Sequence, residues 1–242
     1  MPLLALVELR QYVTYPGQRD VLIDLFETHF IEPQEDLGMA ILGTFREPEH
    51  PSHFTWMRGF SDLDTRARAL NAFYSGPVWT TYRNAANLTM EDSDNVLLLR
   101  EAYSGSGFAM PSAQRAPVGG SALPTGVMVV NIYYLRSEPY AGFVEFFKGE
   151  MSAELRRAGI NTLAALVPEP TPNNYPKLRI REGENLFVWV ARFADAADYQ
   201  RHIAALAKGV HWRNRVSPTL DAQLSSPPEI LKLQPTARSL LR

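Results

Sequence analysis

Residues 54–60, Phe-Thr-Trp-Met-Arg-Gly-Phe, return in diverged form as residues 187–193, Phe-Val-Trp-Val-Ala-Arg-Phe. The second tryptophan of this pair lies 133 positions after the first, and the same spacing joins Trp79 to Trp212. A repeat of this length predicts two copies of one folding unit in one chain. We therefore expect an interface like that of a homodimer, with both partners supplied by one polypeptide.

The chain has 242 residues, of which 45% are hydrophobic, which suffices for two modules of ordinary size with a core each. Residues 104–126 are rich in Ser, Gly, Ala and Pro and lack hydrophobic periodicity, so they read as a linker. The predicted domains are therefore a first module at 1–103 and a diverged second module at 127–242.

Charge and cysteine content exclude several classes of function. The formal net charge of −2 gives no electrostatic signature for a nucleic acid or an anionic membrane surface. The chain has no cysteine, which excludes disulfides, thiolate nucleophiles, iron–sulfur clusters and cysteine zinc sites. No apolar run approaches the ~20 residues of a membrane span. We expect a cytoplasmic protein with neither a nucleic-acid nor a membrane partner.

Hydrophobic periodicity predicts the order β-α-β-β-α-β in both modules, which is the ferredoxin-like arrangement. In the first module we expect strands at 4–13, 39–46, 53–60 and 95–101, and helices at 18–31, from 62 or 64 to 73, and from 78. In the second we expect strands at 127–135, 160–167, 185–193 and 229–233, and helices at 141–157, 195–208 and from 211. Residues 47–51 carry two prolines and are predicted as a turn, and a longer loop at 168–183 replaces it in the second module.

Two stretches of the first module resemble the signature of a known family. Residues 7–12, Val-Glu-Leu-Arg-Gln-Tyr, and 15–18, Tyr-Pro-Gly-Gln, are similar to the first strand and turn of the NIPSNAP family. Residues 66–69, Arg-Ala-Arg-Ala, and 77–79, Pro-Val-Trp, resemble its second helical segment, and the similarity covers about residues 5–101. The resemblance implies a dimeric α+β barrel, in a superfamily that includes monooxygenases and haem-degrading enzymes. It implies no settled activity, because NIPSNAP proteins have none.

We accordingly predict an α+β fold in which two ferredoxin-like βαββαβ repeats form an intramolecular pseudodimeric α+β barrel. A sheet covered by helices on one side leaves its second face open. Depending on register, Trp56 or Met57 would lie on that face. An exposed apolar face is a liability that the sheet of the other module can cover.

The first strand supplies the main candidate site. Alternation puts Glu8, Arg10 and Tyr12 on one face, where the guanidinium could anchor a carboxylate or enol-type oxygen while the other two side chains orient the ligand. The structural alternative is that these residues form a Glu–Arg ion pair, or cross-strand salt bridges, at the rim of the barrel.

The second module has lost this row of residues. Asn131, Tyr133 and Leu135 stand at the corresponding positions. One explanation is that Asn131 and Tyr133 face Glu8 and Arg10 across the interface between the modules.

Histidines offer weaker candidates. His29 lies on the apolar stripe of the first helix, where it could act as a proton shuttle in a pocket between helix and sheet or simply be a satisfied core histidine. His50 and His53 flank Pro51, but no third metal ligand is evident. We therefore predict no metal and no cofactor, although a haem held by one axial histidine leaves no spacing signature.

The favoured function is binding of a small, largely apolar organic molecule in a pocket of the first module. A catalytic version would perform a cofactor-independent isomerase, cyclase or monooxygenase type of step with Glu8, Arg10, Tyr12 and His29. The alternative is a non-enzymatic binding or assembly module, and the protein partner we consider is a second copy of the chain. An enzyme predicts a concave site with converging polar groups and a perturbed pKa, whereas a scaffold predicts a barrel filled by aromatic side chains.

Overall fold

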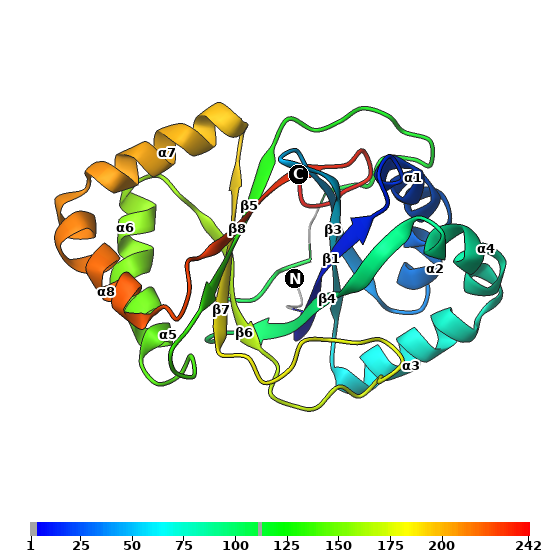
Figure 1. Cartoon of the computed structure of the whole chain (residues 1–242), viewed down its shortest axis with the longest axis horizontal. Helices are drawn as coiled ribbons and strands as arrows, with labels where there is room; N and C mark the ends of the chain where they lie inside the picture. Colours follow the sequence, from blue (N-terminus) through cyan, green and yellow to red (C-terminus); the bar gives the residue numbers. More distant parts are fainter. Residues whose placement is uncertain (1–3, 111–112) are drawn as a thin grey trace.

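The computed structural model describes residues 4–110 and 113–242, and its two halves lie side by side with their sheets inward and their helices outside (Figure 1). The first half contains β1 (Leu6–Thr14), α1 (Arg19–His29), α2 (Ile31–Glu35), β2 (Ala40–Glu47), β3 (His50–Phe60), α3 (Leu63–Ser75), α4 (Pro77–Asn87) and β4 (Met90–Glu101). The second half contains β5 (Val127–Tyr134), α5 (Phe143–Phe146), the π-helical turn η1 (Phe147–Met151), α6 (Ser152–Arg157), β6 (Thr162–Pro168), β7 (Leu186–Phe193), α7 (Ala196–Lys208), a second π-helical turn η2 (Trp212–Val216), α8 (Ser217–Gln223) and β8 (Glu229–Pro235). Both halves follow the predicted order of elements.

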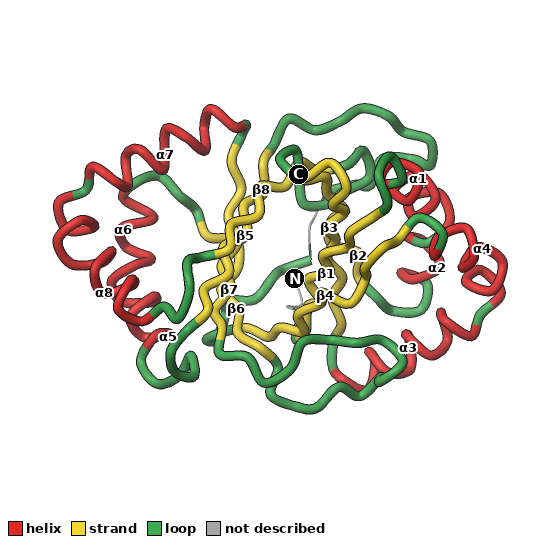
Figure 2. Tube along the Cα trace, viewed as in Figure 1, coloured by secondary structure: helices red, strands yellow, loops and turns green. Residues whose placement is uncertain are grey.

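The eight strands form one closed barrel in the order β1-β3-β2-β8-β5-β7-β6-β4. Each half supplies four neighbouring antiparallel strands, and the halves are joined where β2 pairs with β8 and where β4 pairs with β6. Figure 2 shows the two yellow sheets facing each other between two layers of red helices. The predicted pseudodimeric α+β barrel is confirmed.

The barrel lumen is a packed, mainly aliphatic core shared by the two halves. Val7 and Leu9 of β1 point into it, and so does Met57 of β3, while Trp56 points to the helices. The second half contributes buried residues of the same kind: Met128, Val130, Ile132, Leu166, Leu186, Val188, Val190 and Leu233. Each sheet therefore covers the apolar inner face of the other.

The predicted turn at 47–51 is too long. Strand β2 continues to Glu47 and β3 begins at His50, so only Pro48 and Glu49 form the turn. Pro51 is accommodated because it is the second residue of β3 and is exposed, at the end of a strand where a missing N–H costs little.

One loop of the second half leaves its own module. Residues 169–185 connect β6 to β7, and Figure 1 shows this yellow segment running beneath the barrel to α3. Arg181 forms a parallel bridge with Leu97 of β4, and its N–H donates to the carbonyl of Val96 at 2.8 Å.

The stretch between β4 and β5 includes the predicted linker at 104–126, and the proposed domain limits stay a prediction. No helix of the described residues combines the length and the hydropathy that crossing a membrane would require.

Candidate functional site

The polar row of β1 faces the helices and not the barrel lumen. Glu8, Arg10 and Tyr12 are all buried, at 0%, 1% and 8% exposure. Arg10 Nη1 donates to Glu8 Oε2 at 2.8 Å, and Arg10 Nε donates to the Tyr12 hydroxyl oxygen at 2.9 Å. The three side chains expected to share a face are thus one connected cluster.

Glu8 also binds two further arginines that lie far away in sequence. Arg58 stands directly opposite Glu8 on β3 and donates from Nε to Oε2 at 2.8 Å. Arg66 of α3 donates from Nε to Oε1 at 2.7 Å. Burial alone would raise the pKa of Glu8, but the charges of Arg58, Arg10 and Arg66 outweigh it and hold that pKa well below its usual range.

The cluster holds more positive than negative charge. Arg58 and Arg66 are both fully buried, and with Arg10 they set three guanidinium groups against the single carboxylate of Glu8. Arg58 Nη1 donates to Gln34 Oε1 at 2.9 Å, a neutral acceptor, and Arg66 Nη2 is buried without a hydrogen-bond partner. A buried excess of positive charge is unfavourable unless an anion is added.

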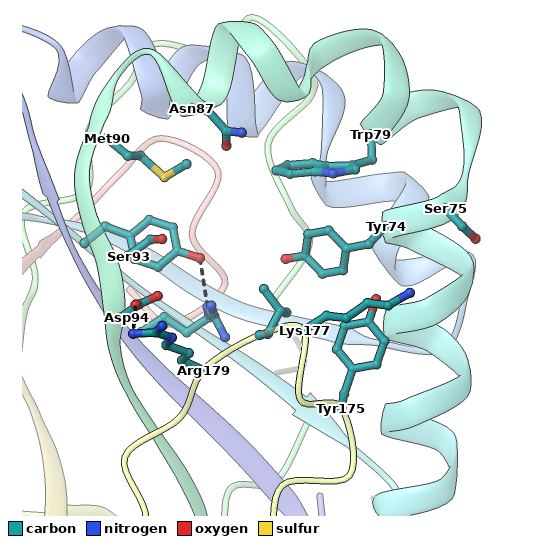
Figure 3. Close-up of a pocket in the computed structure, with 13 residues that line it drawn as sticks. Tyr74, Ser75, Trp79, Asn87, Met90, Ser93, Asp94, Tyr175, Lys177 and Arg179 are labelled. Carbon is teal, nitrogen blue, oxygen red and sulfur yellow. Dashed lines mark hydrogen bonds and ion pairs between the residues drawn. The ribbon is translucent and has the colours of Figure 1, made fainter.

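A cavity of about 370 Å³ opens onto this cluster (Figure 3). Arg10 and Tyr12 of β1 line its inner wall, and Tyr74 of α3 and Trp79 of α4 line its helical side. Figure 3 shows the hydroxyl of Tyr74 pointing into the cavity. The site is therefore concave and combines aromatic surface with converging polar groups, as expected of a ligand site.

A smaller apolar recess of about 40 Å³ continues the cavity towards α1. The two spaces share Tyr12, Tyr74, Trp79 and Met90. Beyond them the recess is bounded mainly by apolar side chains, which are Leu22, Phe26, Phe30, Trp56, Phe73 and Ala86. A ligand would thus meet polar groups beside an apolar extension.

The outer wall of the cavity belongs to the second half of the chain. Tyr175, Lys177, Leu178 and Arg179 of the crossing loop line it. The ring of Tyr175 lies roughly parallel to that of Tyr74, with centroids 6.2 Å apart. Both halves of the chain therefore contribute to the site, although the row of Glu8, Arg10 and Tyr12 from which it was predicted lies in the first half.

The crossing loop is fastened on both sides of this wall. Arg66 Nη1 donates to Asn173 Oδ1 at 3.1 Å and to Asn174 Oδ1 at 2.7 Å. On the far side Arg181 Nη1 donates to Asn95 Oδ1 at 3.0 Å. Because Arg66 also binds Glu8, the loop is tied directly to the charged cluster.

Tyr12 is arranged as a hydrogen-bond donor to a ligand. Its oxygen accepts from Arg10 Nε, which leaves its own hydroxyl hydrogen free for another acceptor. Burial raises the pKa of Tyr12 and outweighs the opposing charge of Arg10, so the phenol stays protonated at neutral pH. The Tyr12 hydroxyl can therefore donate a hydrogen bond to a ligand in the cavity.

His29 does not join the cluster. Its half-buried imidazole stacks on Tyr82 of α4, with ring centroids 3.9 Å apart and planes inclined by 12°. It is not among the residues that line the cavity. The geometry therefore gives no support to the predicted proton shuttle, and the contact with Tyr82 is a packing contact between α1 and α4.

The proposed contact between the two polar positions of β5 and the row on β1 is wrong. Tyr133 is buried in the outer core of the second half with Phe143 and Trp189. Strands β1 and β5 are separated by three strands in either direction around the barrel, and their polar rows point to opposite helical layers.

The two histidines that flank Pro51 contact each other and Glu47. His50 and His53 stack with centroids 4.7 Å apart, and His53 Nδ1 lies 3.2 Å from Glu47 Oε2. Across residues 4–110 and 113–242, no group of three or more His, Cys, Asp or Glu side chains is placed to hold a metal ion.

Comparison with known proteins adds a match to a family model and a set of solved structures with the same fold. Residues 7–105 match the NIPSNAP family model. An anthrone oxidase-like protein superposes with a TM-score of 0.62 at 12% identity, covering 97% of this chain and 94% of that chain. A candidate monooxygenase from Fusobacterium nucleatum superposes with a TM-score of 0.59 at 10% identity, covering 98% of this chain and 94% of that chain. A candidate monooxygenase from Lactobacillus acidophilus superposes with a TM-score of 0.56 at 13% identity, covering 96% of this chain and 94% of that chain. At these identities the likeness shows a shared fold, and no curated protein matches the chain in sequence.

Proposed function

We propose that the protein binds a small, largely apolar organic molecule that carries an acidic oxygen, in the cavity lined mainly by the segment that matches the NIPSNAP family model. The observation that carries this proposal is the excess of buried positive charge beside the cavity. Three guanidinium groups face one carboxylate, and one of them, that of Arg10, lines the cavity. A carboxylate, phenolate or enolate would offset the excess and accept hydrogen bonds from Arg10 and Tyr12.

The walls of the cavity support an aromatic body for this ligand. Tyr12, Tyr74, Trp79 and Tyr175 surround it, and the apolar recess extends it towards α1. Aromatic rings bind planar apolar groups by stacking and edge contacts. The lumen of the barrel, by contrast, is filled with packed aliphatic side chains, so the ligand is assigned to the space between sheet and helices.

The first test compares an acid with its uncharged analogue. We expect 2-naphthoate to bind at least tenfold more tightly than 2-naphthamide in calorimetric titration, and Arg10→Met to abolish most of that preference. A charge-assisted hydrogen bond in a desolvated site contributes about 1.5–3 kcal/mol. Folding should survive because Glu8 keeps Arg58 and Arg66.

The matched control for this experiment is Arg68→Met. Arg68 is exposed on α3 and does not line the cavity. Its loss should leave both affinities unchanged. Equal affinity for the acid and the amide in the unmodified protein, or a preference that persists without Arg10, would refute the proposal.

A catalytic role follows naturally from anion binding. A site that stabilises the conjugate base of an acidic C–H group lowers the cost of removing that proton. The resulting carbanion can reduce dioxygen: an aryl CH2 group becomes C=O, one oxygen atom enters the product and the other leaves as water. The two-sheet single-chain fold shared with the anthrone oxidase-like protein supports this candidate. The isomerase and cyclase alternatives use the same anion without oxygen, so oxygen uptake during anthrone turnover separates them.

The proposed binding depends on neither the predicted localisation nor the predicted protein partner. A cytoplasmic location and a homodimer of such chains both stay predictions.

A further inference from the structure

Basic side chains line the cavity at both its inner and its outer wall. Arg10 lies on β1, whereas Lys177 and Arg179 project from the crossing loop of the second half (Figure 3). Arg179 is partly balanced by Asp94, whose Oδ2 lies 3.5 Å from Arg179 Nη1. Lys177 has no carboxylate within ion-pairing distance among the described residues. The outer wall thus carries a cation that the protein itself does not neutralise.

The local charge differs sharply from that of the whole chain. Cavity and buried cluster together contain five basic side chains, those of Arg10, Arg58, Arg66, Lys177 and Arg179. Two carboxylates, those of Glu8 and Asp94, stand against them, which leaves an excess of three positive charges. The chain as a whole has a formal net charge of −2. Such concentration of one sign in a cleft attracts ligands of the opposite sign.

The backbone on either side of the outer cations is held in place. Asn173 Nδ2 donates to the carbonyl of Leu178 at 2.7 Å, and Asn174 Nδ2 donates to the carbonyl of Leu63 at 2.6 Å. Arg181 fastens the following residues to β4. The backbone that carries Lys177 and Arg179 is therefore fastened to α3 and β4, and only their exposed side chains are free to adjust.

We propose that the ligand is an aromatic diacid. Its inner acidic group is bound by Arg10 and Tyr12, its ring lies among the aromatic walls, and its outer acidic group is bound by Lys177 with help from Arg179. This inference rests on the proposed function and adds to it the second charge. It also gives the second half a role in the site: the long loop that replaces the short turn at Pro48 and Glu49 selects the outer end of the ligand.

The test uses naphthalene-2,6-dicarboxylate beside 2-naphthoate and 2-naphthamide. We expect the diacid to bind about fivefold more tightly than the monoacid at low ionic strength, with the advantage shrinking as salt is added. Lys177→Met should remove most of this advantage, so that it weakens binding of the diacid much more than binding of 2-naphthoate. The matched control is Lys208→Met, because Lys208 is exposed on α7, which contributes no residue to the cavity.

The three compounds separate the two proposals. If the diacid and the monoacid bind with equal affinity, and both bind more tightly than the amide, the proposal of an aromatic diacid is overturned and the proposal of a bound acid stands. A diacid advantage that survives Lys177→Met also overturns the assignment of the outer group. An amide that binds as well as the monoacid overturns the proposed function itself, and failure of all three compounds to bind overturns both.

Discussion

Replacing Glu8 with glutamine is expected to lower the free energy of unfolding by about 3–5 kcal/mol, which is typical when one member of a buried ion pair is removed. The amide would leave Arg10, Arg58 and Arg66 without their common counter-ion inside the fold. Urea denaturation measures the loss. Asp24→Asn, an exposed acid-to-amide change on α1, is the control and should cost less than about 0.5 kcal/mol.

The same variant should also change the response to acid. The folded pKa of Glu8 lies below its unfolded value, so its contribution to stability is fully present above that unfolded value. It declines as pH falls further, by up to about 1.4 kcal/mol per pH unit. Glu8→Gln should therefore flatten the stability profile below about pH 4.5. A variant with unchanged stability and an unchanged profile would show that Glu8 is not the buried counter-ion.

Shortening Leu9 to alanine is expected to destabilise both halves of the molecule together. Leu9 is 1% exposed and points into the lumen, where it packs in a core that includes Met128 and Val188 of the second half. Removing a buried leucine side chain costs about 2–5 kcal/mol. Because the lumen core is shared, amide hydrogen exchange should accelerate in β5 and β7 as well as in β1.

The control for the lumen experiment is Leu88→Ala, because Leu88 is 78% exposed beyond the end of α4. Its loss should change neither stability nor exchange appreciably. Faster exchange confined to β1–β4 in Leu9→Ala would mean that the halves are independent units, contrary to a barrel closed by both sheets.

The fold could be predicted because the hydrophobic patterns that mark its strands are local in sequence and occur in both halves of the chain. The paired Trp56 and Trp189 segments predicted two similar halves, and alternation placed each strand within five residues of its observed limits. The turn at 47–51 was misjudged because proline was treated as a sheet breaker, although a strand end tolerates it. Sequence could not show whether Trp56 or Met57 faces the lumen, because that depends on strand register.

Part of the site could be predicted and part could not. Alternation placed Glu8, Arg10 and Tyr12 together, but Arg58 and Arg66 were missed. Each carried a signal: Arg58 shares a strand face with Trp56 and Phe60, and Arg66 occupies an apolar position of α3 with Leu70 and Phe73. A charge in such a place is buried and requires a partner.

No comparable feature of the sequence indicated that residues 173–179 contribute to the outer wall of the cavity. Nothing in a proline-rich loop sequence states which module it will cover, and the path across the barrel is a tertiary property. His29 was misplaced for a related reason: its helix packs against α4 as well as the sheet, so a position on the buried side does not imply contact with the cavity.

A crystal of the protein soaked with 6-bromo-2-naphthoate would show where the acid binds, because bromine is located unambiguously by anomalous scattering. We expect one bromine peak between β1, α3 and the crossing loop, with the carboxylate within hydrogen-bond distance of Arg10 and Tyr12. A carboxylate turned out towards solvent, or a ligand held elsewhere while this cavity holds only water, would contradict the proposed binding site.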